Sequence, residues 1–308
     1  MSENIDSSIV ATDSNIIYHY CSCEKFYKII ENKELWLTYY KHMNDYKERE
    51  YLNELLESIF TKLNETDSER VDIFNNLTRY DREILFKHDS YFACFSLNGD
   101  LLSQWVKYSD NANGFSIGFN KNVIINKIKC LKHNLCNDRR FSFCTYKHLN
   151  IQEIQYEDLD HHPFLERIIK HYMSEPCIPC YDGIDNYDYD SDLNDVCTFI
   201  NELPEICNYI KNPFFKEEHE YRLILNEFSE FTFPKIIKPK KYRAVKNGLS
   251  PYYALDLSKF DNLIEKVILS PKNISNPDDI ESFIKERFKD SNAISNTFTV
   301  EKSKGTYR

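Results

Sequence analysis

Glycine and proline are scarce in this sequence, and the scarcity excludes several classes of protein. Only 6 of the 308 residues are glycine and 10 are proline, which is too few for a low-complexity or disordered chain. The sequence contains no G-x-x-x-x-G-K and no G-x-G-x-x-G loop. It therefore gives no sign of a P-loop NTPase, a kinase or a Rossmann dehydrogenase, which cradle phosphates with such loops.

The chain also lacks a positive charge balance and a long apolar run. Its 39 basic and 49 acidic residues give a net charge of −10, which disfavours non-specific binding to nucleic acid or to an anionic membrane. Because no stretch of 18 apolar residues occurs, we predict no transmembrane helix and no membrane partner. The polar segment Met1–Asp13 does not resemble a secretory signal, and ten cysteines without one indicate reduced thiols, so we expect a cytoplasmic protein.

Aromatic residues are plentiful, with 22 tyrosines and 21 phenylalanines, so the chain can build a sizeable core. Helical and strand-like periodicities are mixed without strict alternation, which favours an α+β fold over a doubly wound sheet. We predict a loose leader at residues 1–14 and one α+β domain at 15–308, with a helical and acidic-loop insertion at 157–212. Ser22 and Asn276 are predicted to begin helices, because each precedes an apolar helical pattern.

The segment Lys216–Leu225 concentrates charge at the start of an apolar alternation. We predict a strand here, and successive side chains of a strand point to opposite faces. Glu218 and Glu220 would then share one face and raise one another's pKa, as paired carboxylates do in many active sites. A solvated acidic run before a strand would show the same pattern.

Two further clusters allow a functional and a structural interpretation. Cys177 and Cys180 form one C-x-x-C pair near His161, His162 and His171, but a structural zinc site usually needs a second pair; we therefore expect no metal. The basic segment 235–246 could contact nucleic acid, and it could equally form a surface hairpin.

A set of short motifs resembles a bacterial family, domain-of-unknown-function family 2971. The resemblance extends over about residues 16–270 and is weakest in the insertion. The motifs that carry it are Tyr18-His19-Tyr20, Leu35-Trp36-Leu37, Met43-Asn44-Asp45, Cys94-Phe95-Ser96, Trp105 with Tyr108, Gly114-Phe115 with Gly118-Phe119, the E-x-E-Y-R element ending at Arg222, and Val267-Ile268-Leu269.

The order of these motifs is also similar, more weakly, to ADP-ribosyltransferase-like folds, and this resemblance implies a mixed or antiparallel split sheet, flanked by helices, that grips NAD. That resemblance implies that Glu220, Glu218 and His19 are catalytic, with His19 bonded to the nicotinamide-side ribose. It further implies that the cofactor-binding residues, besides His19, are Tyr20, Ser96, Trp105, Tyr108 and Arg222.

We therefore expect an NAD-using ADP-ribosyltransferase-like enzyme or NAD glycohydrolase. Its acceptor would be a macromolecule, either protein or nucleic acid, and its setting bacterial defence against phage or a toxin system. One alternative is a metal-dependent nuclease that uses Glu217, Glu218, Glu220 and Asp45 as ligands. Another is a non-enzymatic sensor or partner-binding module, in which the acidic pair closes a salt bridge to Arg222 or Lys216.

Overall fold

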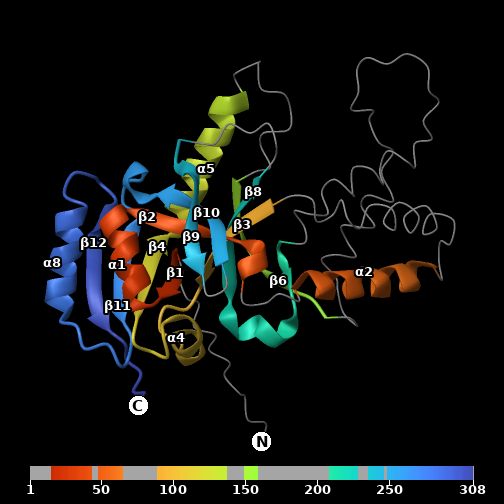
Figure 1. Ribbon diagram of the computed structural model, residues 1–308, viewed down its shortest axis with the longest axis horizontal. Helices are drawn as coiled ribbons and strands as arrows, with labels where there is room; N and C mark the ends of the chain where they lie inside the picture. Colours follow the sequence, from red (N-terminus) through yellow and green to blue (C-terminus); the bar gives the residue numbers. More distant parts are fainter. Residues whose placement is uncertain are drawn as a thin grey trace, which may run out of the picture.

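The protein is described by a computed structural model that covers residues 15–43, 48–64, 89–136, 149–158, 208–227, 235–245 and 248–307. Figure 1 shows a central sheet with helices packed around it. The predicted leader and residues 159–207 of the predicted insertion lie outside the described residues. Among the helices described, none combines the length and the apolar character that crossing a membrane requires.

The ten strands of the central sheet are β1 (Ile16–Cys21), β2 (Glu34–Tyr39), β3 (Asp89–Ser96), β4 (Phe115–Asn120), β5 (Leu149–Glu153), β8 (Glu220–Glu227), β9 (Ile237–Val245), β10 (Gly248–Asp256), β11 (Ile264–Leu269) and β12 (Ile294–Lys302). A separate parallel pair consists of β6 (Gln155–Tyr156) and β7 (Ile210–Lys211). The helices described are α1 (Cys23–Asn32), α2 (Glu48–Asn64), α4 (Leu102–Tyr108), α5 (Lys121–Cys136) and α8 (Pro277–Arg287), with short 3₁₀ turns η1 (Tyr40–His42), η3 (Pro213–Glu218) and η4 (Leu257–Lys259).

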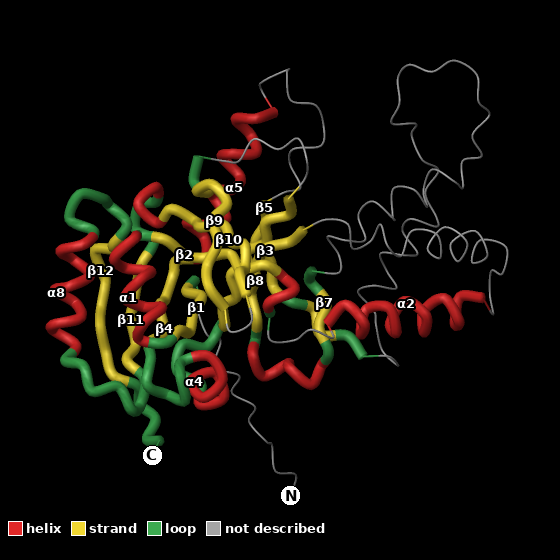
Figure 2. The backbone as a smooth tube through the Cα atoms, in the orientation of Figure 1, coloured by secondary structure: helices red, strands yellow, loops and turns green. Residues whose placement is uncertain are grey.

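The central sheet is mostly antiparallel and follows the order β12-β11-β4-β1-β3-β2-β10-β9, with β8 paired to β3 and β5 to β8. Among the strands that the structure describes in this sheet, only β11 and β12 run parallel. The helices α1 and α8 lie side by side near β12 (Figure 2), where the rings of Tyr27 and Phe283 stack at 5.9 Å. The mixed α+β class with a mostly antiparallel sheet and flanking helices is therefore confirmed.

The sheet divides at β3. One edge of β3 pairs with β8 along its whole length, from Asp89↔Glu227 to Ser96↔Glu220. On the other edge β1 meets β3 at Ser96, whereas β2 meets it at Phe92. β1 and β2 thus pair with different parts of the same edge of β3. They separate between these two points and leave a split in the sheet.

Local capping signals explain why the first helix begins and ends where it does. The Ser22 side chain accepts a hydrogen bond from the Lys25 backbone N–H, and Lys33 closes the helix in the left-handed conformation. Phe26, Ile29 and Ile30 are buried on one face, which follows the predicted helical spacing. Burying each such side chain contributes about 1.5–3 kcal/mol, so α1 is fixed firmly against the sheet beside β1.

One predicted strand start is wrong. Glu218 ends the 3₁₀ turn η3, His219 is left-handed with φ of 42°, and the strand β8 begins only at Glu220. The two acids therefore do not share a strand face. The Asn212 side chain caps η3 and Pro213 follows it, so a helix start signal lies ahead of the acidic run.

Candidate functional site

A cavity of about 310 Å³ opens in the split of the sheet. Its walls include Tyr18 and His19 from β1, Trp36 from β2, Cys94 from β3 and Tyr108 from α4. Gly118 of β4 gives Tyr18 its space, because a Cβ atom there would lie 3.1 Å from the Tyr18 ring and 2.8 Å from Ile16. Gly118 thus lets two side chains of β1 lie close to the backbone of β4.

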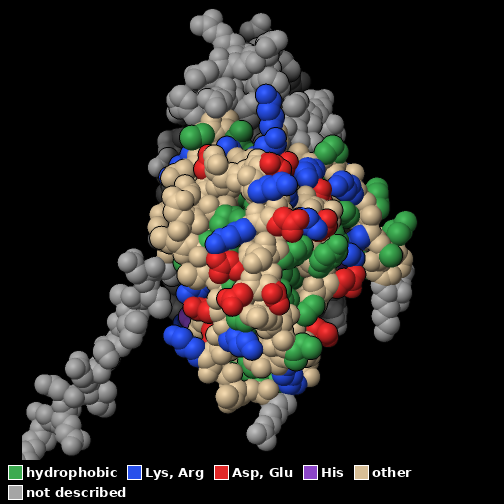
Figure 3. Space-filling view, turned by 90° about the vertical axis from the view of Figure 1, so that its left-hand side faces the viewer, with side chains coloured by type: hydrophobic (Ala, Val, Ile, Leu, Met, Phe, Trp, Pro, Cys, Tyr) green, Lys and Arg blue, Asp and Glu red, His purple; other side chains and the backbone are tan. Residues whose placement is uncertain are grey.

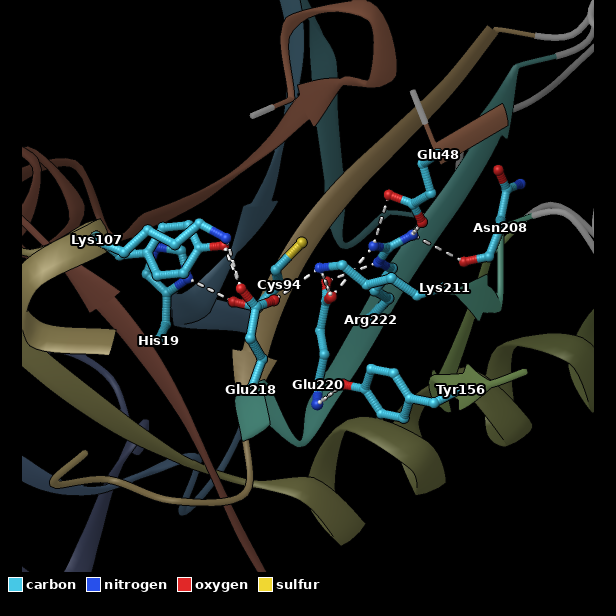
Figure 4. A network of polar contacts seen from close by, with 11 residues as sticks. His19, Glu48, Cys94, Lys107, Tyr156, Asn208, Lys211, Glu218, Glu220 and Arg222 are labelled. Atoms are coloured by element: carbon cyan, nitrogen blue, oxygen red, sulfur yellow. Dashed lines mark hydrogen bonds and ion pairs between the residues drawn. The ribbon is translucent and has the colours of Figure 1, made fainter. Parts of the chain in front are cut away.

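The two predicted catalytic acids meet at a lysine. Nζ of Lys211 lies 2.7 Å from Oε2 of Glu218 and 2.8 Å from Oε2 of Glu220, as Figure 4 shows. All three side chains are buried and line the cavity. The carboxylates are therefore neighbours, as predicted, although a cation and not a shared strand face brings them together.

Arg222 fixes Glu220 from the opposite side. Its Nε lies 2.7 Å from Oε1 of Glu220 and its Nη2 lies 3.2 Å from Oε2, so the contact is bidentate. The same guanidinium binds the carboxylate of Glu48 at the start of α2 and donates to the carbonyl of Asn208 at 3.1 Å. Since Arg222 is only 1% exposed, this triad is a buried ion network.

These charges decide the protonation of the acids. Burial alone would raise the pKa of Glu220, but the charges of Arg222 and Lys211 outweigh it and hold that pKa well below its usual range. Burial raises the pKa of Glu48, although Arg222 opposes the rise. The prediction that the two acids raise one another's pKa is therefore wrong for Glu220. The attraction of the nearby positive charges outweighs the repulsion from the second acid.

Glu218 has a more accessible set of partners. Its Oε1 lies 2.7 Å from Nζ of Lys107 and accepts a hydrogen bond of 3.1 Å from the Tyr108 hydroxyl. The Lys107 side chain is 36% exposed. Of the cations that hold the two acids, Lys107 is thus the one most free to exchange its partner.

The side chain of His19 links β1 to β3 beside the split. Its Nδ1 lies 2.9 Å from the carbonyl oxygen of Cys94, so the neutral ring carries its proton on Nδ1 and keeps Nε2 as an acceptor. Burial lowers the pKa of His19 to about 4. Burial and the nearby Glu220 carboxylate raise the pKa of the Cys94 thiol, which disfavours a thiolate nucleophile at this point.

Three predicted cofactor residues serve the fold through their polar groups. The Tyr20 hydroxyl donates to the Asn98 carbonyl at 2.7 Å and accepts from the Leu101 N–H. The Ser96 hydroxyl accepts from the Asn98 N–H at 3.1 Å. Both residues still line the cavity. Trp105 is not among the residues that line it; this side chain is 1% exposed and its Nε1 donates to Asp100, and its contact with a ligand stays a prediction.

The ends of the predicted insertion supply part of the site. In the β6–β7 pair, Gln155 lies opposite Ile210 and Tyr156 opposite Lys211, so the chain returns beside the point where it leaves. The Tyr156 hydroxyl accepts a hydrogen bond of 2.9 Å from the Glu220 N–H. Lys211 thus reaches the acids from the segment that we had predicted as an insertion.

The residues that the two alternative functions invoke lie in different surroundings. No group of three or more His, Cys, Asp or Glu side chains within the described ranges is placed to hold a metal ion, and Glu217 is exposed. Asp45, Cys177 and Cys180 lie outside those ranges. The salt bridge predicted between Glu220 and Arg222 is present, whereas Lys216 is exposed.

The basic segment forms the hairpin β9–β10, and much of its charge is paired. Lys238 and Lys241 both contact Oε1 of Glu34, and Lys240 contacts Glu227. On the face that carries α8, acidic and basic side chains are interspersed (Figure 3). Nucleic-acid contact at this hairpin stays a prediction.

Residues 114–118 spell G-x-S-x-G, the pattern of a hydrolase nucleophile elbow, which we did not predict from the sequence. An elbow needs its serine exposed on a sharp turn between a strand and a helix. Ser116 instead lies inside β4, fully buried, between Tyr20 of β1 and Ile268 of β11. Residues 115–118 of the motif are therefore part of a strand, and the motif does not form a nucleophile elbow.

Comparison with known proteins identifies one family. Residues 104–223 match the family model described as "Protein of unknown function (DUF2971)". No curated protein and no solved structure matches the chain. The matched stretch contains Lys107, Lys211, Glu218, Glu220 and Arg222, and it excludes His19 and Ser96. The match thus supports the resemblance to this family over the part of the chain that supplies Glu218, Glu220 and their cationic partners.

Proposed function

We propose that the cavity binds NAD and that the protein cleaves the nicotinamide–ribose bond, passing ADP-ribose to a macromolecule or to water. The observation that carries the proposal is a row of paired residues across three strands. Tyr18 of β1 lies opposite Ser96 of β3, which lies opposite Glu220 of β8. This row borders the split, with the neutral His19 beside it.

The residue types suit this chemistry. When the bond between ribose C1′ and the nicotinamide nitrogen breaks, its electron pair leaves with nicotinamide and positive charge develops on the ribose. A fixed carboxylate stabilises that charge, as in glycoside hydrolysis. Water or an acceptor group then bonds to C1′ and loses a proton. Tyr18 and Tyr108 supply aromatic walls for the nicotinamide ring.

Glu218 and Glu220 have different tasks in this proposal. Both oxygens of Glu220 are bound to the buried Arg222, and one of them also to Lys211, so Glu220 positions Lys211. Glu218 takes the charge-stabilising task, because its partner Lys107 is the exposed one. A ribose hydroxyl could replace Lys107 at Oε1, and Nε2 of His19 could accept a hydrogen bond from a second hydroxyl.

The complete pairing of both acids also favours a second candidate, a nucleotide-binding module without chemistry. In that account the salt bridges of Lys107, Lys211 and Arg222 only hold the split open for a ligand. The two candidates share the cavity and differ in turnover.

The test is the release of free nicotinamide from NAD by the purified protein. We expect release by the wild type and a fall of about 10²–10³-fold in Glu218→Gln, the usual cost of losing one electrostatic partner of a transition state. Glu217→Gln is the matched control, because Glu217 is adjacent but exposed, and it should keep the wild-type rate.

Three results separate the candidates. Equal rates in Glu218→Gln and the wild type would contradict the role of Glu218. NAD binding without nicotinamide release, in the presence of protein and nucleic-acid extracts, would favour the binding module. Neither binding nor release would refute the proposal.

A further inference from the structure

The cavity contains more positive than negative side chains. Five cations line it, namely Lys25, Lys107, Lys211, Arg222 and Arg243, against the three carboxylates Glu48, Glu218 and Glu220. Lys107, Lys211 and Arg222 all form ion pairs with these acids. Lys25 and Arg243 form none with any carboxylate in the described part of the chain.

Arg243 reaches the cavity from β9, across β10. Its Nη2 donates to Oγ1 of Thr38 at 3.0 Å, and its guanidinium carbon lies 5.2 Å from the centre of the Trp36 ring. The Nε atom is buried and has no hydrogen-bond partner among the described residues. Burial lowers the pKa of Arg243, but an arginine keeps its charge in a protein. A desolvated charge without a counter-ion is costly unless a ligand supplies one.

Trp36 presents a second buried donor at the same place. Its Nε1–H also lacks a partner among the described residues, while its ring packs on Tyr252 at 4.9 Å. Trp36 and Arg243 both line the cavity. Indole N–H, guanidinium N–H and lysine ammonium groups donate hydrogen bonds and accept none. The group that satisfies them must therefore be rich in acceptors and negatively charged.

We propose that Arg243 and Trp36 form a phosphate-binding subsite at the β2/β9 end of the cavity, to whose lining Lys25 adds a further positive charge. Arginine's planar fork suits phosphate oxygens, and the indole N–H adds a directional donor. The assignment to NAD rests on the proposed function. It places the phosphates of the dinucleotide beside Arg243 and the nicotinamide riboside beside Glu218. The subsite itself requires only a phosphate group.

The test measures binding by calorimetry with ADP-ribose, inorganic pyrophosphate and nicotinamide riboside as probes. We expect Arg243→Gln to weaken ADP-ribose and pyrophosphate about 10–100-fold, which corresponds to the loss of a charged hydrogen bond. Trp36→Phe keeps the ring and removes only the N–H, and should weaken both several-fold. Nicotinamide riboside, which has no phosphate, should bind all variants equally.

The matched control is Arg287→Gln, which removes the same charge from α8, where Arg287 pairs with Glu31 outside the cavity. This variant should bind as the wild type does. Arg243→Lys keeps the charge and loses the fork, and should bind with intermediate affinity. It also provides a readout if Arg243→Gln fails to fold.

The outcomes distinguish this subsite from the proposed chemistry. If ADP-ribose or pyrophosphate binds in an Arg243-dependent way and NAD is not cleaved, the subsite stands and the proposed enzyme activity falls. If phosphate compounds do not bind, or bind Arg243→Gln and Arg243→Lys as tightly as the wild type, the subsite is refuted.

Discussion

The two ends of the cavity differ in how their charged side chains are paired. At the β8 end, Lys107, Lys211 and Arg222 are matched by Glu48, Glu218 and Glu220, and each acid holds at least two donor atoms. At the β2/β9 end, Arg243 contacts the Thr38 hydroxyl and the face of the Trp36 ring. The charges of the first end are paired with one another, whereas the second end has buried donors without a partner among the described residues.

This difference separates two roles that a charged residue can have. A buried ion network depends on every member, because removing one leaves its partners charged and desolvated. A cation kept for a ligand adds little to the stability of the empty protein, so its removal affects binding instead. Arg222 and Arg243 are the two arginines of one cavity on which this contrast can be tested.

The largest expected effect is that of Arg222→Met. It leaves Glu220 and Glu48 without their shared guanidinium, and we expect the free energy of unfolding to fall by about 3–5 kcal/mol. Urea denaturation at pH 7 measures the change. In Arg287→Met, where the pair is more exposed, the loss should be much smaller. An equally small loss in Arg222→Met would show that the network is not structural.

A pH effect should come next, from His19. Its pKa in the folded protein is about 4, below the ordinary 6.5, so the unfolded chain binds the extra proton between these values. The stabilisation is therefore complete above pH 6.5 and is lost as the pH falls towards 4, by on the order of 3 kcal/mol in total.

The variant His19→Gln isolates this contribution from the other histidines. Urea titrations at several pH values between 6.5 and 5 should show a shallower fall in its stability than in that of the wild type. Identical slopes would mean that His19 is protonated without cost and is not held neutral by its burial.

Tyr108→Phe should have a smaller effect. It removes one donor from Glu218 and leaves Lys107 and Lys211 in place, so we expect a loss of about 1 kcal/mol in the free energy of unfolding. A loss as large as that of Arg222→Met would extend the tightly coupled network to α4.

The smallest expected change is that of Arg243→Met. An apolar side chain of similar length replaces a cation that has no described counter-ion, so the stability of the empty protein should change by less than about 1 kcal/mol in either direction. A loss of several kcal/mol in a urea titration would indicate that Arg243 is structural and would remove the contrast with Arg222.

Local signals in the sequence predicted two helix starts well. Ser22 and Asn276 cap α1 and α8 as expected, because a cap depends on neighbouring residues only. The acidic run was harder, since Glu218 and Glu220 alternate like strand residues, although Asn212 and Pro213 begin a 3₁₀ turn there. A stricter use of the helix-start rule would have found it.

The partners of the acids could not be predicted in this way. Lys211 depends on a parallel pair of only two residues per strand, Gln155–Tyr156 with Ile210–Lys211, for which no local pattern exists. Glu48 and Arg222 are far apart in the sequence and meet only through the fold. The sequence thus indicated which acids to examine, but their charge state depended on long-range pairing.

The most direct test of the central claim is a crystal structure of Glu218→Gln with NAD. We predict the ligand in the split between β1 and β2, with its nicotinamide riboside beside residue 218 and its phosphates within hydrogen-bonding distance of Arg243 and Trp36. NAD bound elsewhere, or a cavity that stays empty at saturating NAD, would contradict the account.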